Sequence, residues 1–260
     1  MITLEASELQ QNIARVAEIG PIKVWSVVVT VLGDLLQAPA DTLSARQLDA
    51  LVAPMGINNQ ALRVAVHRLR NDGWIETHRE GRRSRHQLTA KGWAETERVR
   101  PHVYGEAPTR SGGVFLIVGP PQMAAPEFAE LMPEDGTVLT SRSGLVVGAE
   151  GVPSNWLCTP YNEASPPDWV QDALSPKDIS SEYDALREVV MPLLKAELPE
   201  DLVARTALRL AILHHWRRLR LRHGALPDLV LKDGWAGARC RDVVLDALSR
   251  FERPALSSLE

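Results

Sequence analysis

The chain has 260 residues, 45% of them hydrophobic, which is enough to bury the core of one large domain or of two to three small ones. Its formal net charge is only −4, which excludes a uniformly basic protein that coats nucleic acid without a defined face. No signal-peptide pattern opens the chain and no apolar run reaches the roughly 20 residues that cross a bilayer, so we expect a cytoplasmic protein without a membrane partner.

The two cysteines, Cys158 and Cys240, lie far apart and in no metal-ligand spacing. They predict neither a disulfide framework nor a zinc site, and no motif indicates another cofactor. We expect both to be reduced, structural thiols.

The charge is unevenly distributed along the chain. Residues 58–91 hold eight Lys and Arg side chains and three acidic ones, a net +5 that leaves −9 for the remainder. A basic face on an acidic body indicates one defined docking surface for a polyanion.

The N-terminal residues predict two helices. Leu4, Leu9, Ile13 and Val16 have near-helical spacing in residues 1–20, which we interpret as an amphipathic arm that either forms a dimer contact or has no role of its own. Residues 23–36 are rich in valine, which also suits a strand, but the apolar positions recur every three to four residues and do not alternate. We therefore expect a second helix there.

Local capping signals organise the next segment. Ser44 and Gln47 have capping-box spacing, and Pro54 and Gly56 should end the short helix that follows. Asn58 is a suitable N-cap for another helix. Two short helices with a tight turn between them predict a helix-turn-helix.

The second of these helices has two distinct faces. Its inner face carries Leu62, Ala65, Val66 and Leu69, and its outer face is polar. Arginine matches the two major-groove acceptors of guanine, and Asn or Gln matches adenine, so the outer face suits base readout. The alternative is a solvated surface, and His67 could be a surface histidine without a role. The candidate DNA contacts on this helix are Asn59, Gln60, Arg63, His67 and Arg70.

A basic hairpin is expected after this helix. Gly73 suits a left-handed helix end, and Glu80-Gly81 marks a turn between two extended runs. The tip carries Arg82, Arg83 and Arg85, which we expect to contact phosphates or the minor groove and to supply affinity more than sequence choice. A helix from Thr89 to near Pro101 should follow. Helix, turn, helix and basic hairpin together predict a winged helix-turn-helix.

Several motifs in residues 27–105 resemble the PaaX family of bacterial transcriptional repressors. They are L-G-D, A-P-M-G-I-N, R-x-A-V-x-R-L-x-x-D-G-W from Arg63 to Trp74, G-R-R-S from Gly81 to Ser84, L-T-x-x-G from Leu88 to Gly92, and Tyr104-Gly105. The resemblance implies repression of genes for aromatic-acid catabolism of the phenylacetate type, relieved by an aromatic acyl-CoA. It also implies that Gly73, Trp74 and Gly81 are architectural.

The middle of the chain has the spacing of a small α+β domain. After a linker at Thr109 to Gly113, we expect strands at 114–118, 137–140, 144–148 and 156–159, and a helix at 127–132. This β-α-β-β spacing fits a ferredoxin-like domain, and the family resemblance implies one similar to small CRISPR-associated endoribonucleases. Gly119-Pro120-Pro121 stands where such a nuclease would hold its metal-binding acid, so catalysis is not expected.

The C-terminal part is predicted to be helical at 183–194, 202–222 and 238–248. Leu213 to Leu219, Leu226-Pro227 and Gly234 to Gly237 resemble the C-terminal domain of the same repressors. His214 and His215 are adjacent and point in different directions on a helix, so they should not bind one metal. Glu182, Asp184 and Glu188 lack a nucleophile or glycine-rich loop that would indicate an enzyme.

Residues 202–223 contain six arginines and no acid. They could bind the phosphates of an acyl-CoA effector, or they could form a solvated face that pairs with the acidic body. The candidate effector contacts are Arg209, Trp216, Arg217 and Arg220, with Trp216 as an apolar wall.

These observations predict an α+β multidomain regulator with three parts: a winged helix-turn-helix with its helical arm at 1–105, a ferredoxin-like domain at 106–165 and a helical domain at 166–260. We expect a homodimer on operator DNA and no enzymatic activity. Two alternatives stay open. One is a nucleic-acid-processing enzyme that uses the middle domain, and the other is a winged helix that binds protein.

Overall fold

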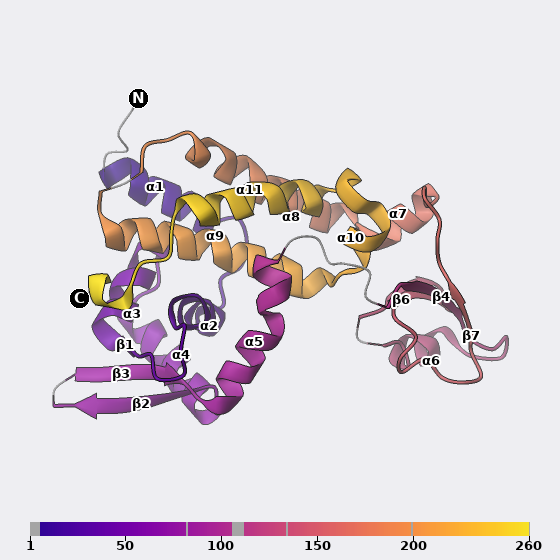
Figure 1. Ribbon diagram of the computed structural model, residues 1–260, viewed down its shortest axis with the longest axis horizontal. Coiled ribbons are helices and arrows are strands. Elements are labelled where there is room, and N and C mark those ends of the chain that lie inside the picture. The colour runs from indigo at the N-terminus through magenta and orange to yellow at the C-terminus, as the bar shows by residue number, and fades with distance from the viewer. Residues whose placement is uncertain (1–5, 82, 106–111, 134, 199, 260) are drawn as a thin grey trace. The chain divides into compact units, whose positions relative to one another are not determined.

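The computed structural model describes residues 6–81, 83–105, 112–133, 135–198 and 200–259 (Figure 1). The chain forms two compact units, each assembled from segments far apart in the sequence. Unit 1 comprises residues 1–104, 185–218 and 241–260, and unit 2 comprises residues 105–184 and 219–240. The chain combines helices with two small antiparallel sheets and has a helical C-terminal region. The predicted α+β class is thus confirmed, and the predicted division into three domains stays a prediction.

The N-terminal segment of unit 1 follows the predicted order of elements. Its helices and strands are α1 (Ala6–Ala17), α2 (Val24–Leu35), β1 (Leu43–Ser44), α3 (Ala45–Val52), the 3₁₀ turn η1 (Ala53–Met55), α4 (Asn59–Asn71), β2 (Ile75–Glu80), β3 (Arg83–Leu88) and α5 (Ala90–Tyr104). The sheet has the order β1-β3-β2 and is antiparallel. Strand β1 was not expected from the sequence because two residues are too short to show a pattern.

Helices α1 and α2 form much of the core of this segment. Leu9, Ile13 and Val16 are buried, so the predicted amphipathic arm is packed against the protein, and Gln10 donates to the carbonyl of Pro54 at 2.9 Å. Leu4 lies outside the described residues. In α2, residues 27–35 are all buried. Because α2 is buried on all sides, the burial of its valines outweighs their modest helix propensity.

Backbone geometry fixes both ends of α3 and α4. Ser44 and Gln47 form the predicted capping box, and Asn58 accepts the amide of Ala61 at 2.8 Å. Gly56 between the helices has φ +80°. At the other end of α4, the amide of Trp74 bonds to the carbonyl of Leu69, which is the Schellman arrangement that a left-handed glycine at position 73 permits.

Helix α5 continues through Pro101 to Tyr104, so the prediction that it ends near Pro101 was short by a turn. Two tertiary contacts hold the last turn. The hydroxyl of Tyr104 donates to Asp34 at 2.7 Å, and the indole of Trp216 donates to the carbonyl of Val103 at 2.8 Å. Neither partner is close in sequence, so local helix-stop signals could not reveal them.

The C-terminal region contains the helices α8 (Lys177–Val190), α9 (Leu202–His223) and α11 (Ala236–Arg250). The 3₁₀ turn η2 (Met191–Leu194) follows α8, and the 3₁₀ turn η4 (Leu256–Leu259) follows α11. Helix α9 is the central helix of unit 1, because every residue from Thr206 to Trp216 is buried. The helix was predicted from the sequence, but its central position was not.

An ion pair buried in unit 1 connects α9 to α2. The guanidinium of Arg209 donates twice to the carboxylate of Asp34, at 2.8 Å each, and once to each carbonyl of Leu248 and Phe251. Burial alone would raise the pKa of Asp34, but the bonds and charges of Arg209 and Arg253 and the bond from Tyr104 outweigh it and lower that pKa. The carboxylate is therefore ionised in the folded protein.

Unit 2 contains a four-stranded antiparallel sheet in the order β5-β6-β4-β7. The strands are β4 (Val114–Val118), β5 (Thr137–Thr140), β6 (Ser143–Val147) and β7 (Leu157–Pro160), and three short helices, α6 (Ala125–Glu130), α7 (Asp168–Leu174) and α10 (Leu226–Leu231), accompany them with the 3₁₀ turn η3 (Lys232–Gly234). The predicted strands are confirmed within a residue. Residues 148–156 form no helix, and the ferredoxin-like assignment stays a prediction. Of the predicted linker, Thr109 to Ser111 lie outside the described residues.

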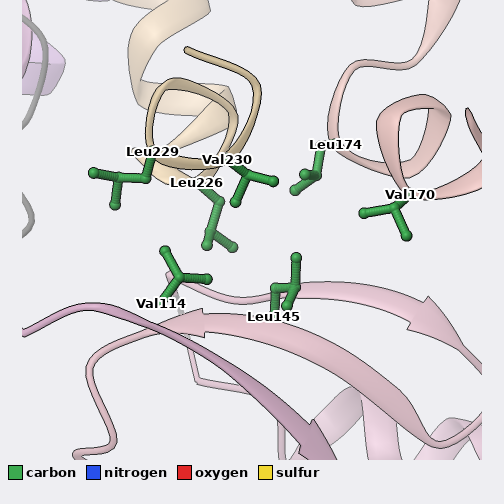
Figure 2. Close-up of a cluster of buried hydrophobic side chains, with 7 residues drawn as sticks. All are labelled: Val114, Leu145, Val170, Leu174, Leu226, Leu229 and Val230. Atoms are coloured by element: carbon green, nitrogen blue, oxygen red, sulfur yellow. The ribbon is translucent and has the colours of Figure 1, made fainter. Parts of the chain in front are cut away.

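Both faces of this sheet are covered. On one face, Val114 and Leu145 pack with Val170 and Leu174 of α7 and with three apolar residues of α10 (Figure 2). On the other, Phe128 of α6 stacks on Trp156 with ring centroids 4.5 Å apart.

Candidate nucleic-acid interface

Helix α4 presents a polar surface to solvent. Leu62, Ala65 and Leu69 are buried, whereas Arg63 and His67 are exposed. The predicted division of the helix into an inner and an outer face is thus observed, except that Val66 of the inner face is only half-buried.

A groove of about 820 Å³ runs along one flank of α4. Helix α3 and the β2-β3 hairpin form its other walls. Its lining residues are Ala45, Arg46, Leu48, Asp49, Asn59, Leu62, Arg63, Val66, His67, Arg70, Thr77, Arg79, Ser84 and His86. Four arginines from three elements therefore converge on one hollow, which gives it the positive potential that a polyanion requires.

Among the described residues that line this groove, one is acidic, and it already has a partner. Asp49 accepts the side-chain amide of Asn59 at 2.9 Å, a bond between α3 and α4. This bond orients Asn59 and uses one of the two hydrogens of its amide, so the other hydrogen and the amide oxygen are left for the predicted base contact. His67 accepts from the amide of Asn71 at 3.3 Å, one turn along the helix.

The wall behind the groove contains a buried histidine. Burial lowers the pKa of His86, and the charge of Arg70 lowers it further. Its Nδ1 lies 2.9 Å from the hydroxyl of Thr77 on the paired strand. The ring is therefore neutral near pH 7 and adds no positive charge to the groove.

The arginines of the hairpin are divided between its two faces. Arg79 faces the groove, together with Ser84. Arg83 and Arg85 line a different hollow of about 810 Å³ on the other side, and Arg85 donates to the hydroxyl of Thr42 at 2.7 Å. The structure thus brings neither Arg83 nor Arg85 to the α4 groove, and Arg82 lies outside the described residues.

Gln60 is also separated from Arg63. It lines a third hollow, on the opposite flank of α4, beside Val64 and Trp25. The predicted contacts on α4 are therefore distributed over two sides of the helix, with Arg63, His67 and Arg70 in the groove.

Sequence reasoning missed two residues of the groove, Arg46 and Arg79. Arg46 is exposed in the first turn of α3 and lines both the groove and the hollow of Arg83. The capping box predicted the start of that helix and could have indicated Arg46. Arg79 could have been found from strand alternation, which places it on the same face as Thr77.

The four predicted effector contacts are engaged within the protein. Arg209 is 4% exposed and bound to Asp34, and Trp216 is buried against Val103. Arg217 donates to the hydroxyl of Ser26 at 3.4 Å. Arg220 belongs to unit 2, where it forms a buried ion pair with Asp228 at 2.6 Å. These contacts do not favour the effector assignment, which stays a prediction.

The alternative of a solvated basic face on α9 also fits poorly, because Arg209 and Arg220 are buried. Within unit 2, Arg222 pairs with Glu182 at 3.0 Å, so an acid from α8 does balance part of the charge.

In the part of the chain that the structure describes, no group of three or more His, Cys, Asp and Glu residues could hold a metal ion. Among the described helices, none is both long and apolar enough to span a bilayer.

Comparison with known proteins gives two matches to one family at opposite ends of the chain. Residues 23–92 match the PaaX-like protein family, and residues 175–260 match the PaaX-like protein C-terminal domain. The chain is also similar to the transcriptional repressor PaaX of Escherichia coli strain K12, with 25% identity over an alignment of 283 positions, gaps included, that covers 96% of this chain and 87% of the relative. The first match contains α2 to β3 and thus the groove, and the second contains all of α9 and α11. The chain therefore belongs to the PaaX-like protein family.

Proposed function

We propose that the chain is a sequence-specific DNA-binding transcriptional regulator and acts as a repressor. The observation that carries this proposal is the groove in which Arg46, Arg63, Arg70 and Arg79 converge beside the exposed face of α4. Its family relationship to a transcriptional repressor supports the same reading and indicates a regulatory, non-enzymatic protein. A cytoplasmic location belongs to the same proposal.

The proposed fold of residues 23–105 is a winged helix-turn-helix. Helix α4 would be the recognition helix in the major groove, the first turn of α3 would lie at the backbone, and the β2-β3 hairpin would be the wing. Arg63 and Arg70 would contact base edges, and Arg46, Arg79, Arg82 and Arg83 would contact phosphates. We also retain the ferredoxin-like assignment for the sheet of unit 2, supported by its β-α-β-β order.

The first experiment identifies the operator by selecting bound duplexes from a random pool. Arg63→Ala should then weaken binding to the selected site by about 1 to 3 kcal/mol and relax discrimination at one base pair, because a bidentate contact to guanine is lost. Binding is measured by fluorescence anisotropy on the selected site and on its single-base variants.

Arg98→Ala is the matched control, since Arg98 is exposed on α5, pairs with Glu95 and lines none of the hollows beside α3, α4 and the hairpin. If Arg63→Ala weakens all sequences equally, Arg63 contacts only phosphate. If the unaltered chain binds no duplex at low salt, the protein-binding alternative for this segment is favoured over DNA recognition.

We further propose a homodimer that places two α4 helices on a two-fold-related operator, so the half-sites would be separated by about one helical turn or a multiple of it.

The resemblance to the family supports an aromatic acyl-CoA of the phenylacetate type as the effector. Such a ligand relieves repression only if its affinity is higher for the form of the protein that cannot bind DNA than for the form that can. Phenylacetyl-CoA should then release the selected duplex, whereas free coenzyme A and phenylacetate should not.

A further inference from the structure

The flank of α4 opposite the basic groove carries a smaller, mainly apolar hollow. It has a volume of about 470 Å³, and its lining residues are Val24, Trp25, Asn58, Gln60, Ala61, Val64, Ala65 and Arg68. Val64 is 65% exposed, the largest exposure among the large hydrophobic side chains of the described residues. A β-branched apolar side chain thus stands on the otherwise polar surface of α4.

The walls of this hollow are held by contacts of their own. The guanidinium of Arg68 lies over the ring of Trp25, 5.4 Å from its centroid, and also 3.6 Å from the carboxylate of Asp72. Asn58 caps α4 through Ala61. These contacts hold the side chains that form the walls of the hollow, and none of its described lining residues is acidic.

Gln60 and Val64 are one helical turn apart, so their Cβ atoms are about 5 to 6 Å from each other. Stacked base pairs are about 3.4 Å apart along the duplex. The two side chains can therefore reach the same base pair or adjacent ones. An amide matches N6 and N7 of adenine, and thymine is the base whose major-groove edge carries a methyl group.

We propose that Gln60 and Val64 form an element that reads A·T base pairs, in which Gln60 bonds to adenine and Val64 packs against a thymine methyl group. This inference rests on the proposed function of α4 as the recognition helix. In this proposal, the two flanks of α4 recognise different base pairs. Gln60 and Val64 read A·T pairs on one flank, and Arg63 and Arg70 suit guanine on the other.

DNA is the favoured occupant of the hollow for two reasons. Gln60 and Val64 are three residues before Arg63 and His67 on the same helix, and positions three apart are neighbours on a helix surface, so a duplex in contact with Arg63 and His67 would reach this flank as well. In addition, the surrounding sequence is basic, with a net +5 over residues 58–91, which suits a polyanion.

The decisive experiment replaces each thymine of the selected operator by uracil, one at a time, which removes only the 5-methyl group. The full chain should lose about fourfold in affinity at one or two positions, the factor expected when one buried carbon group is lost. Val64→Ala should bind the thymine duplex about fourfold more weakly and show no further loss with uracil at those positions.

Val138→Ala is the matched control, because Val138 is 41% exposed on strand β5 of unit 2. It should bind both duplexes like the unaltered chain. A second arm replaces adenines by 7-deazaadenine. Gln60→Ala should weaken binding about tenfold and become insensitive to that replacement at one adenine.

The proposal is overturned if Val64→Ala keeps the full uracil effect, or if no thymine replacement weakens the unaltered chain. It is also overturned if Val64→Ala changes the oligomeric state in sedimentation while the uracil effect persists, since the hollow would then be a contact between copies. In each case the unaltered chain still binds its operator, so the proposed function survives; failure of that binding would instead contradict the function itself.

Discussion

Arginine has different tasks at different positions of this chain, and burial distinguishes them. Arg63 is exposed beside the groove, where its guanidinium is available to a partner. Arg209 is 4% exposed, and its donors bond to Asp34 and to two backbone carbonyls. A buried charge requires such a partner, because desolvation of an unpaired ion is strongly unfavourable. Only the exposed arginines can carry recognition.

His214 in α9 illustrates how burial sets the charge of a residue. The hydroxyl of Thr30 gives its single hydrogen to the carbonyl of Ser26, so Nδ1 of His214 donates to that hydroxyl at 3.3 Å. Burial is the main reason that the pKa of His214 falls to about 3, and the charges of His215, Arg217 and Arg218 lower it further. The imidazole is thus neutral in the folded protein near pH 7.

The neutral form of His214 should make stability depend on pH. Its folded pKa lies below the unfolded value of 6.5, so its contribution is complete above about pH 6.5 and is lost as the pH falls toward 3. Between pH 7.5 and 5.5 we expect this histidine to remove about 1.4 kcal/mol from the free energy of unfolding, measured with urea.

His214→Leu should reduce the pH dependence by that amount, and the hydroxyl of Thr30 keeps its bond to Ser26 in this variant. His78→Leu is a control on the surface of strand β2, where the side chain is half-exposed. An unchanged pH slope in His214→Leu would contradict the assignment of a low pKa to this residue.

At the scale of single elements, local chemistry determined most of the segment that carries the groove. Capping by Ser44 and Asn58 and the left-handed glycines Gly56 and Gly73 depend on a few neighbouring residues, and the structure shows each as predicted. The end of α5 was wrong by a turn, because contacts of Tyr104 and Val103 with distant segments hold it. The sequence therefore predicts the end of a helix where residues near in sequence form the cap, and fails where residues distant in sequence hold the last turn.

Gly92 of α5 makes a testable case of packing between elements. A Cβ at this position would lie 2.1 Å from the carbonyl oxygen of Trp74, a backbone atom at the start of the hairpin. Gly92→Ala should therefore destabilise the protein by about 1 to 3 kcal/mol, as overpacking does, despite the higher helix propensity of alanine. The free energy of unfolding in urea measures the change.

Gly234→Ala is the matched control, because its Cβ would meet no atom within 4 Å and its φ is not in the left-handed region. It should change stability by less than about 0.5 kcal/mol. A stable Gly92→Ala protein would show that α5 can move away from Trp74 without loss of packing.

At the scale of the whole molecule, the C-terminal part of the chain completes the core of unit 1. Arg209 is 175 residues from Asp34, and Trp216 is 113 residues from Val103. The segment with the groove is thus folded together with the first part of α9. An altered packing of α9 could reach the groove through α2, which contributes Asp34 and neighbours α4.

Arg209→Met tests this long-range dependence in the full chain. It leaves the carboxylate of Asp34 buried with Arg253 as its remaining arginine partner, so we expect a loss of about 3 to 5 kcal/mol in the free energy of unfolding. Arg98→Met, which removes a guanidinium that is 71% exposed, should change it by less than about 1 kcal/mol. A similar small effect for both variants would show that the buried pair is dispensable.

The sequence by itself determined the helices, caps and turns around the groove, the basic character of residues 58–91 and the family, because these depend on neighbouring residues and on motifs. It also predicted the strands of unit 2. Only the tertiary structure decided which arginines are exposed and which hollow each of them lines. Arg46 and Arg79 join the groove, Arg85 lies on another face, and Arg209 is buried. Partners distant in sequence set these positions, and no local pattern contains them.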